Sequence, residues 1–281
     1  MAEPWRVLAE SDADVALLQE ASSPPAGLSV HVDDAPWTTA GVGMRRPWRT
    51  AIVALSDRVR VRWRPGLPIT EAEHDQLHVS RPGTVAIADV DDLVTGETIT
   101  VISMYGAWEN PVAEAESQWI FADASVHRII SDISMLIGRQ SGHRIIAAGD
   151  INLLSGYGEY GSAYWAQRYA TVFERFESIG MHLLGPQAPN GVQAEPWPKE
   201  LPRESLNVPT FRLRRTDPAT ATRQLDYVFA SDVLAERAEV RALNGPGDWG
   251  PSDHCRILID VRAEKKNEAE SALELPALRS T

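Results

Sequence analysis

Short apolar runs alternate with longer amphipathic segments along most of the chain. The short runs are rich in β-branched residues and bounded by turn residues, which is the pattern of β-strands. The longer segments repeat apolar residues at helical spacing, most clearly at Val126, Ile129 and Ile133. We therefore predict helices at residues 3–11, 114–137 and 163–179, and strands at 15–18, 50–55, 58–63, 84–88, 98–104, 144–148, 224–229 and 256–261.

The predicted strands are numerous for the helices available to cover them. An α/β fold of four layers, with two mixed β-sheets face to face and helices outside, accommodates this ratio better than one doubly wound sheet. No internal repeat or linker divides the chain, so we predict one domain over residues 1–262. Residues 185–207 carry five prolines and little periodicity, which predicts a long loop, and residues 263–281 form a polar tail.

Composition narrows the class of protein. The chain has 281 residues, of which 43% are hydrophobic and 23% charged, as in an ordinary globular domain. No apolar run approaches the ~20 residues that cross a bilayer, so no membrane span is expected. The N-terminus has no basic region followed by an apolar core, and a cytoplasmic location is expected by default. The single cysteine, Cys255, excludes an internal disulfide and a cysteine-based zinc site.

The charge balance is acidic, with 27 Lys and Arg against 39 Asp and Glu and a net charge of −12. Such a surface repels polyanions as a whole, which argues against tight, non-specific nucleic-acid binding. Arginines nevertheless cluster near residues 45–49, 58–64 and 212–223. Solvated strand faces are the favoured interpretation of these clusters, and a local basic cleft is the alternative.

Four predicted strands end in acid, amide or imidazole groups: LLQE at 17–20, AAGDIN at 147–152, QLDYVFAS at 224–231 and GPSDH at 250–254. Any one of them alone is typical of a helix cap or a turn. Together they would gather several carboxylates, and like charges held close together are unfavourable unless a cation neutralises them. Oxygen ligands with few histidines favour Mg²⁺ or Mn²⁺ over Zn²⁺. The carboxylates in question are Glu20, Asp150, Asp226 and Asp253.

The remaining polar groups suggest how such a site would react. Asp150 and Asn152 are two residues apart, so on an extended segment both side chains would face the same side. One can take a proton while the other donates a hydrogen bond. His254 can contact a phosphate oxygen, with Asp226 holding its imidazole and raising its pKa. A metal, a positioned water and an imidazole together suit phosphoester hydrolysis.

These motifs resemble those of the endonuclease/exonuclease/phosphatase superfamily, which includes DNase I, abasic-site endonucleases, inositol polyphosphate 5-phosphatases and sphingomyelinases. The resemblance runs from about residue 7 to residue 261. It rests on LLQE, the tyrosine of VISMYG, GD-x-N, PTFR before LDYVF, and a closing SDH, all in the order found in the superfamily. The expected fold is therefore DNase I-like.

The resemblance also implies a role for each matched residue. Glu20 would bind the metal, and Asp253 would contact it directly or through water. Asp150, assisted by Asn152, would orient or deprotonate the attacking water. The scissile phosphate would be stabilised by His254, with Asp226 as the partner of that histidine. Tyr105 matches a tyrosine that nuclease members place against this phosphate, although a buried strand-end aromatic with a capped hydroxyl is an alternative interpretation.

In one respect the sequence departs from the superfamily pattern. Members normally open with a strand that carries a metal-binding or ligand-orienting asparagine, whereas this chain starts inside the helix that follows it, at residues 1–6. Either the sequence as given omits this strand, or the protein has lost a ligand and binds metal more weakly. We expect reduced or absent activity in this form, which a version extended upstream would test. A partner chain, or another segment of this one, is an alternative source of a strand to complete the sheet.

The loops near these motifs bear on the substrate. Tyr157 and Tyr160 follow GDIN directly and could stack on bases, or pack onto the next helix. Trp108 could form an opposite wall, and Arg212 and Arg223 could meet a phosphate backbone. We therefore expect a Mg²⁺- or Mn²⁺-dependent phosphodiesterase that acts on DNA or RNA as an endonuclease. The alternatives are a phosphatase or phosphodiesterase of a small soluble or lipid phosphate, and a degenerate, non-catalytic family member.

Overall fold

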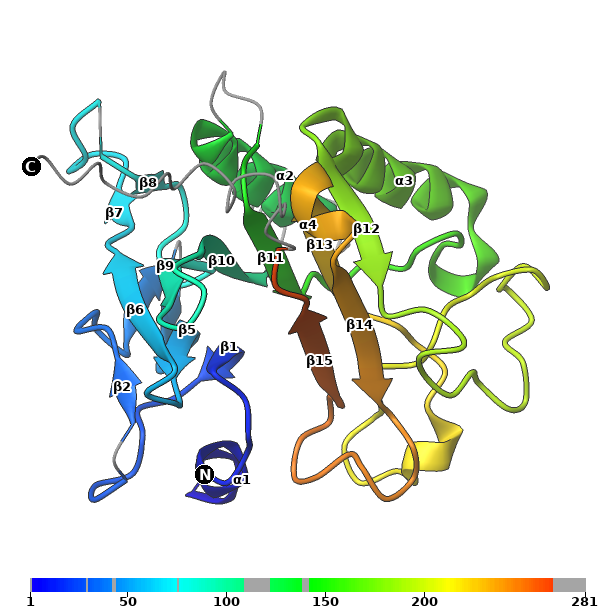
Figure 1. The fold of residues 1–281 in the computed structure, drawn as a ribbon. Helices are drawn as coiled ribbons and strands as arrows, with labels where there is room; N and C mark the ends of the chain where they lie inside the picture. The colour runs from blue at the N-terminus through cyan, green and yellow to red at the C-terminus, as the bar shows by residue number, and fades with distance from the viewer. Residues whose placement is uncertain are drawn as a thin grey trace, which may run out of the picture.

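A six-stranded mixed sheet forms the centre of the molecule (Figure 1). The structure is a computed structural model that describes residues 2–28, 30–41, 44–74, 76–108, 122–137 and 142–264. Strand order is β12-β13-β11-β10-β9-β6, with β10 and β11 parallel and the other neighbours antiparallel. The strands are β6 (Val59–Arg64), β9 (Val85–Asp92), β10 (Thr98–Tyr105), β11 (Ile145–Asp150), β12 (Met181–Gly185) and β13 (Asp226–Ser231).

Two helices cover one face of this sheet, α2 (Ala122–Ile133) and α3 (Ala163–Ser178) (Figure 1). Their apolar stripes pack with alternate residues of β11, such as Ile145 and Ala147, in the larger hydrophobic cluster. The intervening residues, Ile146 and Ala148, belong to a second cluster on the opposite face. Because side chains alternate along a strand, every residue of β11 is buried, and the strand separates two cores.

A second layer of strands covers the opposite face. One part is a sheet of order β1-β5-β2, and the other is the antiparallel pair β14-β15. Leu17 of β1 and Ile257 and Ile259 of β15 pack with Ile146 and Ala148, so both parts lie on the same face of the central sheet. The strands are β1 (Val15–Ala21), β2 (His31–Val32), β5 (Arg49–Ala54), β14 (Ala238–Leu243) and β15 (Arg256–Val261).

Smaller elements complete the described part of the chain. Helix α1 (Ala2–Ala9) buries Trp5, whose ring lies edge-on to Trp37 at 6.1 Å. None of the helices described is long and apolar enough to cross a membrane. The other elements are α4 (Asp232–Ala235), the strand pairs β3 (Thr39–Gly41) with β4 (Met44–Arg46) and β7 (Leu67–Pro68) with β8 (His78–Val79), and 3-10 turns at Ser134–Leu136, Glu159–Gly161 and Pro218–Thr220.

The predicted α/β sandwich is confirmed, and each predicted strand corresponds to an observed one. The predicted helix at 114–137 is observed as α2 from Ala122, and residues 114–121 lie outside the described part. Seven strands of the described part were not predicted: five of only two or three residues (β2, β3, β4, β7 and β8), and the longer β12 and β14. β14 escapes the pattern because Glu239 and Arg241 break its apolar run, and β12 is a short run directly after α3. Most of the predicted tail, from residue 265, also lies outside the described residues.

The arginines of β6 follow the favoured interpretation of solvated strand faces. Arg62 pairs with Asp91 at 2.8 Å, and Arg64 pairs with Asp89 at 2.9 Å, both across the β6–β9 pair. Arg58 lies at the start of the same hairpin and pairs with carboxylates of the loop before β1. These cations are matched by acids on neighbouring segments and do not form a basic cleft.

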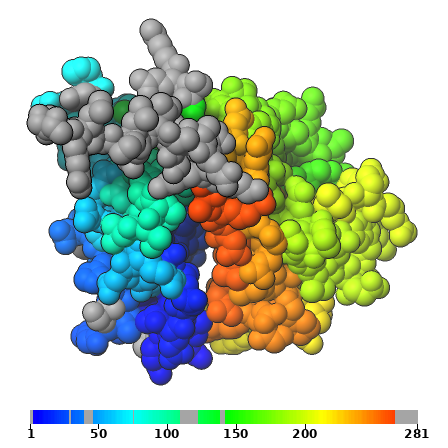
Figure 2. All heavy atoms as spheres, viewed as in Figure 1, coloured from blue at the N-terminus to red at the C-terminus, as the bar shows by residue number. Residues whose placement is uncertain are grey.

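The second layer is interrupted between β1 and β15. Within the described residues β1 pairs only with β5, and β15 only with β14, so each strand has one unpaired edge. Figure 2 shows the surface hollowed between the blue N-terminal residues and the red-orange strands. Leu17, Ile257 and Ile259 remain only partly buried there, unlike the fully buried residues of β11.

We expect amide hydrogen exchange to report this interruption. Amides of β1 and β15 that are directed away from β5 and β14 lack a strand partner, so they should exchange at least about tenfold faster than those of β11. Amides of the same two strands that bond to β5 and β14 are the internal control. Equal protection of both sets, measured by NMR, would show that the edges are covered in solution.

Candidate active site

Three side chains lie in a row at one end of the central sheet. Tyr105 is paired with Asp150 in the β10–β11 register, and Asp150 is paired with Asp226 in the β11–β13 register. Directly paired residues point to the same face of a sheet. The three therefore share the face that carries Ile146 and Ala148, at the rim between the two layers of strands.

Two glycines allow the chain to approach closely at this point. A Cβ at Gly149 would lie 1.9 Å from the carbonyl oxygen of Met104, and one at Gly106 would lie 2.2 Å from the carbonyl oxygen of Ile151. Neither position has room for a side chain. Glycine at these positions thus lets the end of β10 pack directly against the residues that follow β11.

Asn152 holds the carboxylate of Asp150. The backbone N–H of Asn152 donates to Oδ1 of Asp150 at 2.9 Å, and Nδ2 donates to Oδ2 at 3.0 Å and to the carbonyl of Gly106 at 3.1 Å. The predicted extended geometry is wrong here, because the strand ends at Asp150 and Asn152 has a φ of 54°. The two side chains meet because the backbone turns back, and both carboxylate oxygens of Asp150 are fixed.

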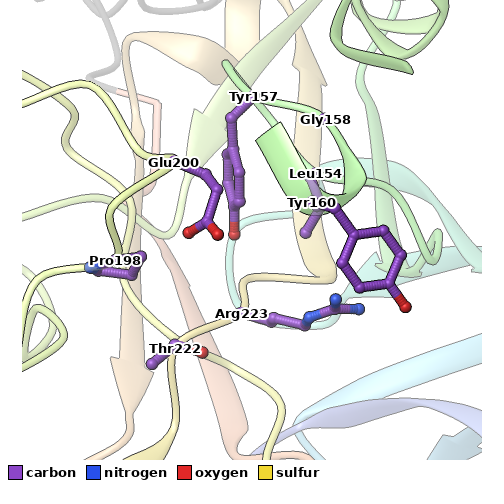
Figure 3. Close-up of a pocket in the computed structure, with 8 residues that line it drawn as sticks. All are labelled: Leu154, Tyr157, Gly158, Tyr160, Pro198, Glu200, Thr222 and Arg223. Atoms are coloured by element: carbon purple, nitrogen blue, oxygen red, sulfur yellow. The ribbon is translucent and has the colours of Figure 1, made fainter. Parts of the chain in front are cut away.

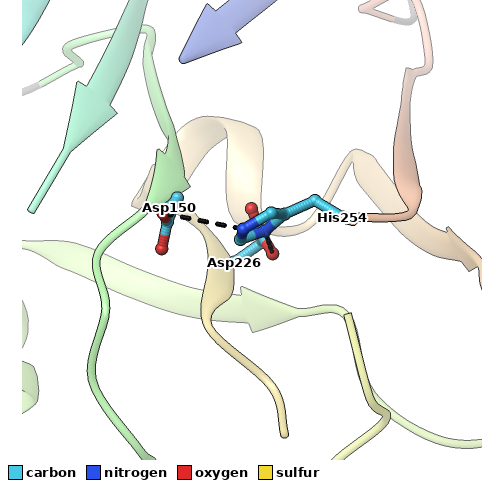
Figure 4. Close-up of side chains that lie close together, drawn as sticks. All are labelled: Asp150, Asp226 and His254. Carbon is cyan, nitrogen blue, oxygen red and sulfur yellow. Dashed lines mark hydrogen bonds and ion pairs between the residues drawn. The ribbon is translucent and has the colours of Figure 1, made fainter. Parts of the chain in front are cut away.

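Asp226 holds His254 in the same site (Figure 4). Nδ1 of His254 lies 2.7 Å from Oδ2 of Asp226, and Nε2 lies 3.9 Å from Oδ2 of Asp150. Thr210 supports the pair because its Oγ1 accepts the backbone N–H of Asp226 at 3.1 Å. The ring of Phe211 packs against the imidazole, with centroids 5.1 Å apart. The imidazole is therefore fixed between two carboxylates.

Burial and mutual charge set the protonation of this group. Burial, followed by the neighbouring charge of Asp226, raises the pKa of Asp150 above its ordinary value. Burial opposes the charged form of His254, but the hydrogen bond and charge of Asp226, together with Asp150, outweigh it and raise the pKa of His254 to about 10. At neutral pH the imidazole is therefore a cation, with one N–H toward Asp226 and the other directed to the Asp150 side.

Tyr105 connects this group to β1. Burial, followed by the nearby charge of Glu20, raises the pKa of Tyr105 above its usual value, so the Tyr105 hydroxyl and Glu20 are neighbours. The pairing of β1 with β5 shifts between Leu18 and Ala21, and Glu20 has a φ of 49° within this bulge. Bulges redirect side chains at functional sites. Tyr105 is buried, and it lies beside Asp150 as well.

No family model matches the chain, and no curated protein matches it. Solved structures do match. The endonuclease domain of TRAS1, a telomere-specific non-LTR retrotransposon, is 19% identical over 94% of both chains, with a TM-score of 0.57. An AP endonuclease from Archaeoglobus fulgidus is 16% identical over 92% of this chain and 93% of its own, with a TM-score of 0.53. The mannosyl-6-phosphatase Bt3783 of Bacteroides thetaiotaomicron is 16% identical over 92% and 90%, with a TM-score of 0.51.

The chain has the fold of the endonuclease/exonuclease/phosphatase superfamily. The similarity extends over nearly the whole of each chain and agrees with the resemblance carried by the sequence motifs. At these identities it establishes the architecture alone.

The donor set at the end of the central sheet fits a hard divalent cation. Asp150, Asp226 and His254 offer ligand atoms within 4.8 Å of one another, but a protonated imidazole bonded to Asp226 cannot donate to a metal. The oxygens on the other side of Asp150 are better placed. Glu20 lies close enough to raise the pKa of Asp150, and the amide oxygen of Asn152 accepts no hydrogen bond from the described residues. Such oxygens suit Mg²⁺ or Mn²⁺.

Asp253 lies beside this group rather than in it. Its charge contributes to the raised pKa of His254, and its carbonyl oxygen accepts the backbone N–H of Arg212 at 2.9 Å. Its carboxylate is not among the grouped ligand atoms of the described residues. Direct ligation by Asp253, as the resemblance implied, stays a prediction.

The predicted substrate-binding residues divide into two kinds. Tyr160 is 85% exposed and Trp108 is 38% exposed, so both rings are accessible, whereas Tyr157 is buried. Arg223 forms an ion pair with Glu159 at 2.8 Å and stays partly exposed. The fifth residue is already engaged, because the guanidinium of Arg212 donates to the carbonyl oxygens of residues 216 and 252.

The sequence pattern assigns no role to Thr210, Phe211 or Gly106, which support the candidate site. Thr210 and Phe211 belong to the PTFR motif that carried part of the resemblance. The motif indicated that these two residues lie near the site. That they position Asp226 and His254 follows only from the observed hydrogen bond of Thr210 and the backbone bridges of Phe211. Gly106 follows Tyr105 directly, and its role depends on the parallel pairing of β10 and β11.

Proposed function

We propose that this chain is a phosphodiesterase dependent on Mg²⁺ or Mn²⁺ that cleaves DNA or RNA as an endonuclease. One observation carries the proposal: the imidazole of His254, held by Asp226, faces an oriented carboxylate at a separation of 3.9 Å. Such a pair combines a base for a water with a charged donor for a phosphate oxygen.

In the proposed reaction, the ionised Asp150 accepts a proton from a water whose oxygen attacks phosphorus. Asn152 keeps the carboxylate in one orientation through its two hydrogen bonds. His254 donates from Nε2 to a non-bridging phosphate oxygen as charge builds up there, and the bond to the leaving oxygen breaks as solvent supplies its proton. Tyr105 remains a neutral donor beside Glu20.

A bound divalent ion would be held by Glu20, Asp150 and Asn152. It would supply positive charge to the phosphate oxygens and lower the pKa of a bound water. The raised pKa of Asp150 supports this assignment, because a nearby cation favours the ionised form of a carboxylate that its surroundings otherwise disfavour.

A phosphatase acting on a small soluble or lipid phosphate is the second candidate. Two observations favour it: the net charge of −12, which repels a polyanion, and the shared fold of the mannosyl-6-phosphatase. A degenerate, non-catalytic member is the third. The proposed location for all three is the cytoplasm. The unpaired edges of β1 and β15 also support the proposal that an extended strand from another segment or chain completes the sheet.

An assay on the purified chain separates these candidates. We expect cleavage of plasmid, single-stranded DNA or RNA with Mn²⁺ or Mg²⁺, and none with a chelator. Phosphate release only from sugar, inositol or nucleotide monophosphates would favour the second candidate. No reaction, together with an unfolding midpoint that Mn²⁺ does not raise, would favour a non-catalytic member. A metal that binds the folded state must stabilise it, so an unchanged midpoint means that no metal binds.

A further inference from the structure

A pocket of about 190 Å³ is lined in part by the segments that carry the candidate active site (Figure 3). The segments that carry the active residues also carry this pocket, since Leu154 follows Asp150 by four positions and Arg223 precedes Asp226 by three. Phe211 forms backbone bridges with both Arg223 and His254, which joins the pocket to the imidazole. Its lining consists of Leu154, Tyr157, Gly158, Tyr160, Pro198, Glu200, Thr222 and Arg223.

The charges around this pocket disfavour a second phosphate. Arg223 is already neutralised by Glu159, whose two oxygens accept from the guanidinium at 2.8 and 3.3 Å. Glu200 is exposed and forms no ion pair with a described residue, so it leaves a net negative charge at the pocket. A carboxylate with free lone pairs accepts hydrogen bonds from neutral hydroxyl groups.

Tyr157 adds a second hydroxyl-binding group. Burial raises the pKa of its phenol to about 12, and Arg223 opposes this only in part, so the hydroxyl is neutral at physiological pH. A neutral phenol both donates and accepts. In Figure 3 the Tyr157 hydroxyl and the Glu200 carboxylate are directed to the same part of the pocket. Together they suit a sugar hydroxyl, which can donate to the carboxylate and accept from the phenol.

Tyr160 presents an aromatic face at the edge of the pocket. Its ring is 85% exposed, and its backbone has φ 55° and ψ 26°, in the left-handed region that non-glycine residues seldom adopt. The loop packs closely on the start of α3, since a Cβ at Gly158 would lie 2.2 Å from the carbonyl oxygen of Ser162. Strain of this kind gathers at ligand sites, and an exposed ring suits stacking on a base or a sugar face.

We propose that this pocket binds the sugar of the substrate through a free hydroxyl, with Glu200 and Tyr157 as its partners and Tyr160 stacked on the ring or its base. This rests on the proposed function and refines it to a ribonucleotide rather than a deoxyribonucleotide, because only the former carries a 2′-hydroxyl. A site built to bond a hydroxyl discriminates strongly against a substrate that lacks it.

The test compares kcat/KM for single-stranded RNA and DNA oligonucleotides of one sequence. We expect the chain to favour RNA at least about tenfold, and Glu200→Gln to remove most of this preference. Glu204→Gln is the matched control: it removes the same charge from an exposed residue of the same loop that does not line the pocket, so it should leave the ratio unchanged. Tyr160→Ala should weaken both substrates and keep their ratio. Cleavage without RNA preference, or a preference that Glu200→Gln leaves intact, would overturn the assignment while the nuclease stands.

A binding experiment separates the pocket from catalysis. Calorimetry with adenosine and 2′-deoxyadenosine 5′-monophosphates, in chelator, should show tighter binding of the ribonucleotide that Glu200→Gln abolishes. If no nucleic acid is cleaved, the proposed function fails, but tighter binding of the ribonucleotide would still support the pocket assignment. Equal affinities for the two nucleotides would overturn the pocket assignment. Hydrolysis of ribose 5-phosphate in place of RNA would assign the hydroxyl to a free sugar phosphate.

Discussion

Replacing Asp150 by asparagine should lower the rate of metal-dependent phosphoester hydrolysis by about 10³-fold. Asparagine keeps the size of the side chain, but it cannot accept the proton of the attacking water. One of the two hydrogen bonds that Asn152 donates to this side chain would also be lost, since the new amide nitrogen would replace one of the two accepting oxygens. Steady-state cleavage at saturating Mn²⁺ measures the loss, and Asp57→Asn, an exposed change outside the site, is the matched control.

The same variant should not unfold more easily than the wild type. The raised pKa of Asp150 means that the folded state prefers the protonated side chain. The stability tied to this group is therefore complete below the ordinary aspartate pKa and is lost as pH rises through the raised one. A neutral asparagine avoids that loss, so its unfolding midpoint at pH 8 in chelator should be no lower. An inactive variant with a much lower midpoint would point to a structural role for Asp150.

Much of this site was accessible from the sequence because its residues lie at the ends of apolar strands. Asp150 ends β11 and Asp226 begins β13, and because these strands are antiparallel the two ends lie at a common rim. The contact between Asp226 and His254 is also the one that the resemblance of the motifs implied. What the pattern could not give was the register, which sets Tyr105, Asp150 and Asp226 side by side.

The misjudged features depend on local backbone geometry or on tertiary contacts. Asn152 reaches Asp150 through a left-handed turn, whereas two-residue spacing assumed an extended segment. Arg212 was expected near a phosphate; its guanidinium donates to the carbonyl oxygens of residues 216 and 252, and contact with a phosphate stays a prediction. Glu200, which lines the pocket, lies in the proline-rich loop, where no periodicity places a side chain. A single sequence records residue types, and contacts between distant loops follow only from the fold.

The Asp226–His254 pair should control the alkaline limit of activity. In the proposed reaction the charged imidazole contacts the phosphate, so the rate falls as pH rises through the His254 pKa, which is raised to about 10 in the free protein. The hydrogen bond and charge of Asp226 hold this pKa up against burial. Asp226→Asn removes both, and at a fixed metal concentration the alkaline limb of the kcat profile should therefore move to lower pH.

His254→Gln, which keeps a donor but not the charge, should cost about 10²- to 10³-fold in kcat at pH 7.5. Because Asp226 acts through His254, adding Asp226→Asn to His254→Gln should cost little more, so the double mutant should be far less impaired than the product of the single losses. Additive losses, or an Asp226→Asn profile whose alkaline limb does not move, would contradict this coupling. Asp226 would then have a role in folding, which the unfolding midpoints of the three variants would reveal. Non-additive losses with a shifted limb would instead identify the charged imidazole as the group that meets the phosphate.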